Sequence, residues 1–264
     1  NISCTMSLKI CSLFSGSTGN CTYVWGEGTE MIIDAGVTLS KTEKALKAVG
    51  ADISHISVLV THRHRDHICG LGALVKKYPL VTVYAHAETA QELIGSGVSE
   101  NRLKIFGEDD FYVGAITVCP FALSHDVDCV GFCLRCGGRK ITYMTDTGVL
   151  PPYALTAAEG SDLVLIESNH SPELLAANKS YSYPLKRRIS GLRGHLSNED
   201  CASAVVRLSK SGVKHFILAH LSRENNYPEL AYTVCRDALA AADCGEVGLT
   251  VALPDRLSGL IEIV

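Results

Sequence analysis

The sequence predicts a single α/β domain. Short apolar runs typical of buried strands alternate with segments whose apolar residues recur at helical spacing, along most of the 264 residues. Neither a Pro/Gly/Ser-rich linker nor a low-complexity tract nor a short repeat interrupts this alternation, so we expect one domain spanning 1–264. Several of the predicted strands also end in a histidine or an acidic residue. Because strand ends at one edge of a sheet converge, this pattern indicates a functional site there.

The composition is that of an ordinary globular protein. Apolar residues make up 47% of the chain and charged residues 20%, and the chain is long enough to bury a sizeable core. The formal charge of −4 gives no overall attraction to nucleic acid or acidic membranes, although it leaves room for a local basic patch. We set the first residues, 1–5, aside as a tag or an upstream extension.

The composition also bears on where the protein works. The longest apolar runs fall well short of the ~20 residues that a membrane-spanning helix needs. The N-terminus does not show the basic segment and apolar run of a signal peptide. The eleven cysteines are an odd number scattered along the chain, which is typical of reduced thiols. We therefore predict a cytoplasmic protein that does not enter a membrane.

The first half of the chain is predicted to alternate strands with helices. Apolar β-branched runs predict strands at 9–14, 21–25, 30–33, 56–60 and 80–84, and helical spacing predicts helices at 40–49, 71–78 and 88–95. The loop from Ser15 to Asn20 is rich in small residues. It could cradle an anion or simply make a tight turn, and the turn is the favoured interpretation.

The second half is predicted to begin with two hairpins, 111–121 around Gly114 and 130–145 around Gly137 and Gly138. Between them, 123–126 is expected to end a strand. Further strands are expected at 163–166, 213–219, 249–253 and 260–264, with a helix at 229–242. The spacing of Ser197 and Asp200 is that of a capping box, which opens a helix running to about Lys210.

The turn after the predicted strand 56–60 carries the strongest chemical signal. His62, His64, Asp66 and His67 fall within six residues, just before a predicted helix. Neutral imidazole and carboxylate are the usual ligands of a borderline divalent metal. The alternative is a polar turn that happens to be rich in histidine. It is disfavoured because such closely packed groups would repel one another as cations and are hard to satisfy as neutral groups.

Other polar residues follow strands elsewhere in the chain. A lone histidine at a strand end is more often structural, but several strand ends of metal-ligand type are hard to dismiss together. Besides the turn at 62–67, these strand ends are Asp34, His125, Asp146, the segment 167–170 and His220.

In their order along the chain, these residues resemble the metal motifs of the metallo-β-lactamase superfamily: His62-x-His64-x-Asp66-His67, then His125, Asp146 and His220. The resemblance covers essentially the whole chain. It implies an αββα sandwich, with two β-sheets face to face and helices outside. It also implies two divalent metal ions, zinc or manganese, with iron possible. One ion would be held by His62, His64 and His125 and the other by Asp66, His67 and His220.

The same resemblance assigns supporting roles. Asp146 would bridge the two metals, and Asp34 would orient a ligand from behind. Asp126 could do the same or could be a solvated turn residue. A dinuclear centre activates water for hydrolysis, and Asp66 is placed to orient that water.

Four further segments, 15–21, 167–170, 194–198 and 219–229, resemble the WalJ/YycJ group of bacterial cytoplasmic relatives. This implies a 5′-to-3′ exonuclease acting on DNA, rather than on RNA, with a role in DNA repair. Lys186, Arg187, Arg188 and Arg193 are cations suited to phosphate, although they could equally form a solvated helix face. His195 could contact a phosphate or protonate the leaving oxygen. The candidates for substrate contact are Ser15, Ser17, His170, Arg187, Arg188, Arg193 and Ser197.

Two alternatives remain. A small-molecule hydrolase acting on a thioester, lactone or cyclic phosphodiester would use the same metals. A non-catalytic regulatory protein on this fold would be expected to lose ligands, and the motif series is complete. The sequence leaves the oligomeric state open.

Overall fold

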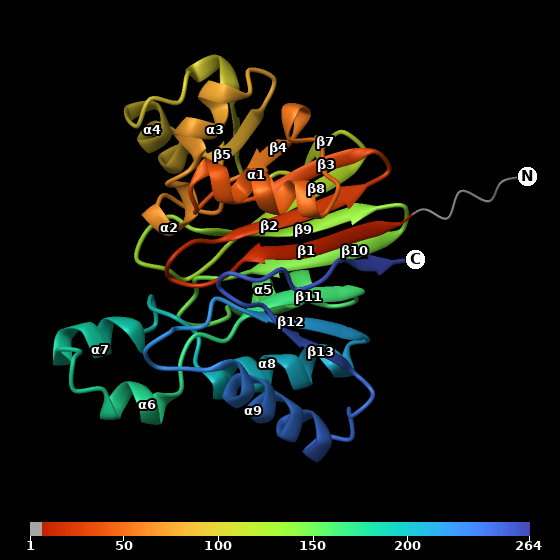
Figure 1. The fold of residues 1–264 in the computed structure, drawn as a ribbon. Helices are drawn as coiled ribbons and strands as arrows, with labels where there is room; N and C mark the ends of the chain where they lie inside the picture. Colours follow the sequence, from red (N-terminus) through yellow and green to blue (C-terminus); the bar gives the residue numbers. More distant parts are fainter. Residues whose placement is uncertain (1–6) are drawn as a thin grey trace, which may run out of the picture.

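Two β-sheets lie face to face, and helices cover their outer faces (Figure 1). This computed structural model describes residues 7–264, so the segment set aside as a tag or extension, 1–5, lies outside the described residues. The arrangement confirms the predicted αββα sandwich. Both described ends of the chain lie at the same side of the sandwich, away from α2 and α7 (Figure 1).

The first sheet has the strand order β14-β1-β2-β3-β4-β5-β6. Neighbours from β14 to β3 pair antiparallel, and neighbours from β3 to β6 pair parallel. Its strands are β1 (Leu8–Phe14), β2 (Cys21–Gly26), β3 (Thr29–Ile33), β4 (Ser57–Leu59), β5 (Thr82–His86), β6 (Leu103–Phe106) and β14 (Ile261–Ile263).

The second sheet has the order β13-β12-β11-β10-β9-β8-β7. It is antiparallel from β7 to β10 and parallel from β10 to β13. Its strands are β7 (Phe111–Val113), β8 (Ile116–Ala122), β9 (Val130–Cys136), β10 (Arg139–Met144), β11 (Leu163–Glu167), β12 (His215–Ala219) and β13 (Gly248–Val251).

Each sheet has its own set of helices. Those around the first sheet are α1 (Leu39–Ala48), η1 (Ile53–His55), α2 (Arg65–Ile68), α3 (Leu71–Lys77), α4 (Ala87–Gly95) and η2 (Glu100–Arg102). Those that follow strands of the second sheet are α5 (Pro152–Ala158), α6 (Pro172–Ala177), α7 (Tyr183–Ile189), α8 (Asn198–Lys210) and α9 (Pro228–Ala241). The described residues contain no helix long and apolar enough to cross a membrane.

Three layers of apolar side chains hold the sandwich together. The central layer lies between the sheets and includes Leu8, Phe132 and Tyr143, all buried. A second layer packs the first sheet against α1, α3 and α4, and a third packs the second sheet against α5, α8 and α9. Burying both faces of each sheet explains why the central parallel strands are continuous apolar runs in the sequence.

Most predicted elements are confirmed, with boundaries shifted by one or two residues. Ser197 caps α8 as expected, accepting a hydrogen bond from the Asp200 backbone N–H at 3.0 Å. The expectation that 123–126 ends a strand is wrong. β8 ends at Ala122, and the following loop is closed by the backbone N–H of Leu123 donating to the carbonyl of Cys129 at 2.9 Å.

Candidate metal centre

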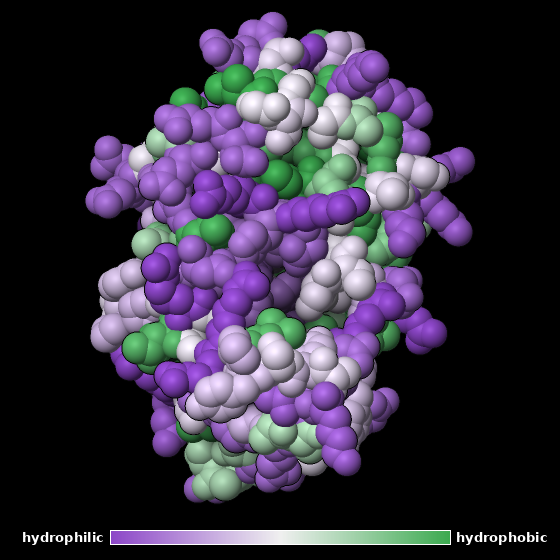
Figure 2. Space-filling model, turned by 90° about the vertical axis from the view of Figure 1, so that its left-hand side faces the viewer, coloured by the Kyte–Doolittle hydropathy of each residue, from purple (hydrophilic) through white to green (hydrophobic). Residues whose placement is uncertain are grey.

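The candidate centre lies where strands of both sheets end. The residues concerned come one or a few residues after β3, β4, β10 and β12, at the end of β11, and in the loop after β8. This edge belongs to the side of the molecule that carries α2 and α7 (Figure 1). Figure 2 shows that side, where hydrophilic side chains gather across the middle between the two halves of the sandwich.

Three residues at these strand ends have left-handed backbone conformations. The φ angles of Asp34, Asp146 and His220 are 64°, 64° and 57°. Positive φ is uncommon outside glycine, and such strain persists where the surroundings enforce it, often at functional sites. In this chain the turn redirects each side chain from its sheet into the shared edge.

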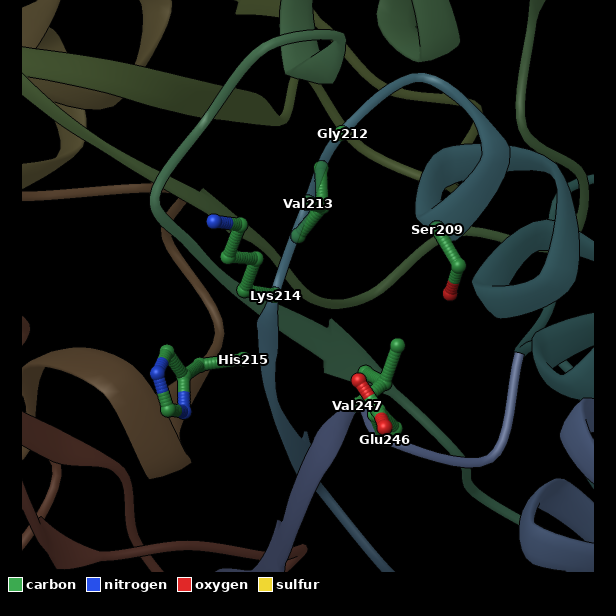
Figure 3. A pocket seen from close by; sticks show the side chains of 7 residues that line it. All are labelled: Ser209, Gly212, Val213, Lys214, His215, Glu246 and Val247. Atoms are coloured by element: carbon green, nitrogen blue, oxygen red, sulfur yellow. The ribbon is translucent and has the colours of Figure 1, made fainter.

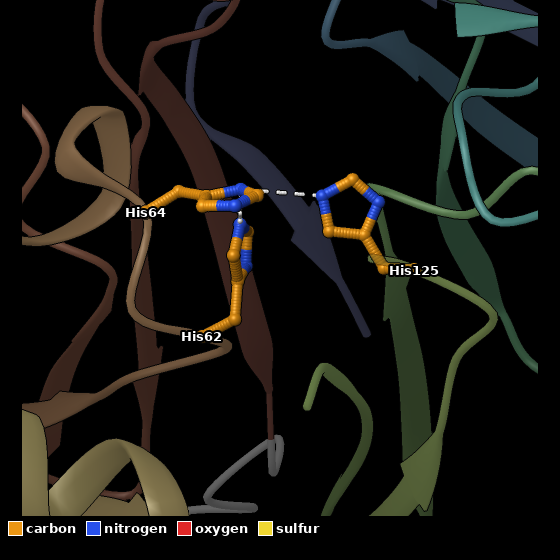
Figure 4. A group of neighbouring side chains, drawn as sticks. All are labelled: His62, His64 and His125. Carbon is orange, nitrogen blue, oxygen red and sulfur yellow. Dashed lines mark hydrogen bonds between the residues drawn. The ribbon is translucent and has the colours of Figure 1, made fainter. Parts of the chain in front are cut away.

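The first ligand group consists of His62, His64 and His125 (Figure 4). The Nδ1 of His64 lies 3.1 Å from the Nε2 of His62 and 3.2 Å from the Nε2 of His125. Nitrogens bound at about 2.0–2.1 Å to one tetrahedral ion are about 3.3–3.4 Å apart, so this spacing fits a shared metal ion. The structure thus brings these ring nitrogens together, although His64 and His125 are 61 residues apart in the sequence.

The second group consists of Asp66, His67 and His220. The Oδ2 of Asp66 lies 3.5 Å from the Nε2 of His67 and 3.6 Å from the Nε2 of His220. The Oδ2 of Asp146 lies 3.3 Å from the Nε2 of His67, and Asp146 also forms a possible ligand set with His67 and His62 of the first group. Two further groups cross between these sets: His62, His67 and Asp146, and Asp146, Glu167, His195 and His220. The division of the ligands between two ions therefore stays a prediction.

In each of these five histidines, the ring nitrogen that faces away from the centre lies beside an oxygen atom. The Nδ1 of His67 meets the Asp34 carboxylate at 2.7 Å, and the Nδ1 of His220 meets the Glu167 carboxylate at 2.8 Å. Such partners fix the tautomer and orientation of metal-binding imidazoles. The remaining contacts are His62 Nδ1 to Thr61 Oγ1 at 2.9 Å, His64 Nε2 to Asp126 Oδ1 at 3.2 Å, and His125 Nδ1 to the carbonyl of Gly194 at 3.1 Å.

The charges of the two groups differ. Burial, reinforced by neighbouring histidines, lowers the pKa of His62, His64 and His125, which favours the neutral imidazole that binds metals. Around the second group burial also disfavours charge, but nearby carboxylates outweigh it and raise the pKa of His67 to about 10. The carboxylates at this centre therefore require positive charge beside them, which divalent metal ions can supply.

Two buried polar atoms support this interpretation. The Oδ2 of Asp146 and the Nε2 of His220 have no hydrogen-bond partner within the described part of the chain. Buried polar groups are nearly always paired, and an unpaired one calls for an explanation. Both atoms face the shared edge, so a metal ion would satisfy both. In residues 7–264, every group of three or more potential ligands lies at this edge.

Glu167 is a site residue whose role the sequence did not reveal. Its Oε1 accepts hydrogen bonds from the Nδ1 atoms of His195 and His220, each at 2.8 Å. Its Oε2 accepts from the backbone N–H groups of Thr147 and Leu196, at 2.9 and 3.1 Å. The sequence shows the segment 167–170 as a polar strand end, but only the fold shows that the Glu167 carboxylate holds His195 and His220 at once.

Asn20 is a second such residue. Its Nδ2 lies 3.1 Å from the Nε2 of His67 and 3.3 Å from the Oδ2 of Asp66. The loop that precedes it makes a tight turn, with the Gly19 N–H donating to the carbonyl of Gly16 at 3.0 Å. The favoured interpretation of this loop as a turn is confirmed, and the turn places the Asn20 amide against the second ligand group.

The predicted substrate residues fall into two classes. Ser17, Arg187, Arg188 and Arg193 are exposed, whereas Ser15, His170 and Ser197 are buried. The Ser15 hydroxyl accepts from the backbone N–H of His220 at 2.7 Å, and Ser197 caps α8. The first contact places Ser15 behind His220, and the second holds the start of α8, so the structure favours a supporting role for both serines.

Arg188 ties α7 to the first ligand group. Its guanidinium donates two hydrogen bonds to the Oδ2 of Asp126, one of them from Nε at 2.9 Å. The other carboxylate oxygen of Asp126 faces His64. Of the two alternatives for Asp126, the geometry therefore favours the one in which it orients a ligand.

A separate cavity of about 370 Å³ lies at the opposite end of β12 (Figure 3). Its lining comes from the end of α8, the start of β12 and the segment before β13, and includes Lys214, His215 and Glu246. These residues do not form one of the ligand groups, so the candidate chemistry stays at the other edge.

Comparison with known proteins places this site in a family. Residues 29–221 match the model of the β-lactamase superfamily domain. The chain is 37% identical to exodeoxyribonuclease YycJ of Bacillus anthracis over 86% of its length and 87% of that protein. It is 34% identical to exodeoxyribonuclease WalJ of Streptococcus pneumoniae over 98% and 99%. The solved structure of the metallo-β-lactamase fold protein YhfI from Bacillus subtilis shares the fold, with a TM-score of 0.74, 16% identity and coverage of 97% and 100%. The chain therefore belongs to the metallo-β-lactamase superfamily and, within it, to the group that contains YycJ and WalJ.

Proposed function

We propose that this protein is a metal-dependent phosphodiesterase that degrades DNA from the 5′ end. We propose that it acts in the cytoplasm and has a role in DNA repair. The observation that carries the proposal is the pair of adjacent ligand groups with Asp146 beside His62 and His67, close to the Glu167–His195 pair. The names of the relatives supply the substrate class, since YycJ and WalJ are both called exodeoxyribonucleases.

The proposed centre holds two divalent ions, zinc or manganese. One would be held by His62, His64 and His125 and the other by Asp66, His67 and His220. Asp146, which lies beside His62 and His67, would contribute a shared carboxylate. When bound, such ions lower the pKa of water from ~15.7 toward neutrality and neutralise negative charge that develops on the phosphate. Asp34, Glu167 and Asp126 hold the far ring nitrogens of His67, His220 and His64, which would orient those imidazoles toward the ions.

Asp66 is the residue proposed to orient the attacking water. With 25% of its side chain exposed, it is more accessible than Asp34, Asp146 and Glu167, which are almost fully buried. Burial opposes its charge, but His220 and His67 outweigh burial and hold the pKa of Asp66 far below its usual range. It therefore stays ionised and accepts a hydrogen bond from water.

His195 is the residue proposed to protonate the leaving oxygen. Its side chain is 23% exposed, and its Nδ1 is held by Glu167, which leaves Nε2 for the substrate. Burial lowers the pKa of His195, but the Glu167 carboxylate outweighs burial and raises it. A protonated imidazole held in this way is suited to general acid catalysis.

The basic segment around α7 is proposed to contact the DNA backbone. Arg187 and Arg193 are exposed, and Arg193 donates to the backbone carbonyl of His125. Guanidinium groups bind phosphate oxygens through two parallel hydrogen bonds. Such contacts would make binding depend on salt concentration. Arg188 donates to Asp126, and Asp126 in turn contacts His64. A phosphate bound by Arg188 would therefore act on the position of His64.

A labelled substrate assay tests this proposal. Purified protein loaded with zinc or manganese is incubated with a 5′-labelled duplex and with its single strand. We expect early release of the labelled terminal nucleotide. Intact DNA with fully loaded protein, together with turnover of a thioester, lactone or cyclic phosphodiester, would replace the proposal with a small-molecule hydrolase.

Two variants separate metal binding from proton transfer. His67→Ala should lose both metal and activity, because the Nε2 of His67 faces Asp66 and Asp146. His195→Ala should lose activity while keeping its metal content. Equal metal loss in both variants would contradict the separate roles.

A further inference from the structure

A cleft of about 610 Å³ opens beside His125, next to the candidate metal centre. The loop after β8 and the start of α5 line it, and Arg193 borders it. Its volume falls within the range of roughly 300–1,000 Å³ that is typical of sites for small ligands. Because a member of the first ligand group lies in its wall, anything bound in the cleft would adjoin the metal centre.

Arg193 marks the cationic part of this cleft. Its Nε donates to the backbone carbonyl of His125 at 2.7 Å, which fixes the guanidinium next to the ligand group. Within residues 7–264, the two terminal nitrogens of this guanidinium have neither a hydrogen-bond partner nor an ion-pair partner. They are available to a phosphate that approaches the metals.

Tyr153 supplies an aromatic surface in the same cleft. It is 54% exposed, although tyrosine rings are usually more buried. It lies in the first turn of α5, where Pro151 and Pro152 restrict the backbone, so its position is well defined. An exposed aromatic ring beside a cation is the usual combination for holding a nucleobase by stacking next to a bound phosphate.

Two carboxylates complete the lining. Asp128 forms an ion pair with His86. Glu88 lines both this cleft and the neighbouring depression, which Arg63 also lines. Negative charge at that border disfavours a second phosphate, and a carboxylate accepts hydrogen bonds from the amino groups of bases. The cleft therefore suits one phosphate near Arg193 and a neutral base beyond it.

We propose that this cleft binds one nucleobase of DNA, that of a nucleotide adjoining the scissile phosphate. The base stacks on Tyr153, and Arg193 contacts the phosphate next to it. This inference rests on the proposed action on DNA and adds to it the residue that positions the strand. Stacking is sequence-tolerant, so the cleft holds any base, as an exonuclease requires.

The test uses 2-aminopurine, a fluorescent base whose emission falls when it stacks. Two short DNA strands carry it at the terminal or the next position, with phosphorothioate linkages that resist hydrolysis. We expect wild-type protein to quench one of the two probes, and Tyr153→Ala to abolish that quenching. With unmodified DNA, Tyr153→Ala should raise KM by about 5- to 150-fold.

The controls keep the outcome interpretable. Tyr153→Phe preserves the ring and should behave like wild type, as should Tyr112→Ala, which removes a tyrosine that is 73% exposed on β7. Circular dichroism establishes that each variant is folded. If wild-type protein quenches neither probe, or if Tyr153→Ala quenches the same probe as wild type or leaves KM unchanged, the base site is refuted.

The failure of the proposed function gives a different result. In that case wild-type protein leaves unmodified DNA intact, whatever the fluorescence shows. Degradation of DNA by wild type and by Tyr153→Ala with the same KM would leave the function standing and overturn the base site alone.

Discussion

Replacing Glu167 by Gln keeps its size and shape but alters the hydrogen bonds that it can accept. The carboxylate receives four, two on each oxygen, and it is fully buried. An amide has one acceptor oxygen, so its NH₂ group must face two of the four donors. Each buried donor left unpaired costs about 1–3 kcal/mol, so the free energy of unfolding should fall by about 2–6 kcal/mol.

The same substitution should impair catalysis through His195. Loss of the carboxylate removes the interaction that raises the pKa of His195, so that pKa falls. Because the protonated imidazole is the proposed donor, kcat declines as pH rises through this pKa. In Glu167→Gln the decline should begin at a lower pH, and kcat near neutrality should fall by about 10²- to 10⁴-fold.

The assay combines denaturant unfolding with a pH profile of kcat on DNA. Glu173→Gln is the matched control, since Glu173 is exposed on α6. The reasoning is refuted if Glu167→Gln unfolds within 1 kcal/mol of wild type and its kcat keeps the same pH dependence, with the same value within a few fold.

Three further predictions concern the centre and its surroundings. Asp34→Asn should weaken metal affinity by about 10- to 100-fold in competition with a chelator, because its carboxylate holds the Nδ1 of His67; unchanged affinity would contradict this role. Gly36→Ala should lower the free energy of unfolding by roughly 1–3 kcal/mol or more, measured in urea, because its Cβ would lie 1.6 Å from the backbone oxygen of Asp66; wild-type stability would show that the loop moves aside. Arg187→Ala should reduce the salt dependence of DNA binding by about one phosphate contact in fluorescence anisotropy, and an unchanged slope would place Arg187 away from the DNA.

The sequence predicted the strands well because each core strand carries an unbroken apolar run. Ile32 and Val58 are buried in the first sheet, and Ile166 and Leu218 in the second. The strand β6 was not predicted because two of its residues, Lys104 and Ile105, are exposed. Its sequence therefore lacks the apolar run of a buried strand. The helix α6 was not predicted because it is short and buries only Leu175. For α7, which buries no residue, the sequence offered a solvated helix face only as one alternative.

The metal ligands were predictable because their type and order are distinctive even without a structure. The residues that hydrogen-bond to these ligands could be predicted only in part. Asp34 follows a strand and was found, whereas Glu167 and Asn20 act on residues far away in the sequence. The Asn20–His67 contact spans 47 positions, and the Glu167–His220 contact spans 53. Such contacts depend on how the two sheets stack, which no local pattern encodes.

The substrate residues show the same limit. A sequence does not show whether a polar side chain is exposed or buried. The structure places Arg193 at a cleft and Ser15 behind His220. The single-domain prediction stays a prediction, favoured by the apolar layer that both sheets share.

Anomalous diffraction from crystals grown with zinc tests the dinuclear centre most directly. We predict two peaks per chain, one among His62, His64 and His125 and the other among Asp66, His67 and His220, with Asp146 in contact with both. The structure also offers a different group of potential ligands, formed by Asp146, Glu167, His195 and His220. A single peak within that group, with none among the three histidines His62, His64 and His125, would contradict the account.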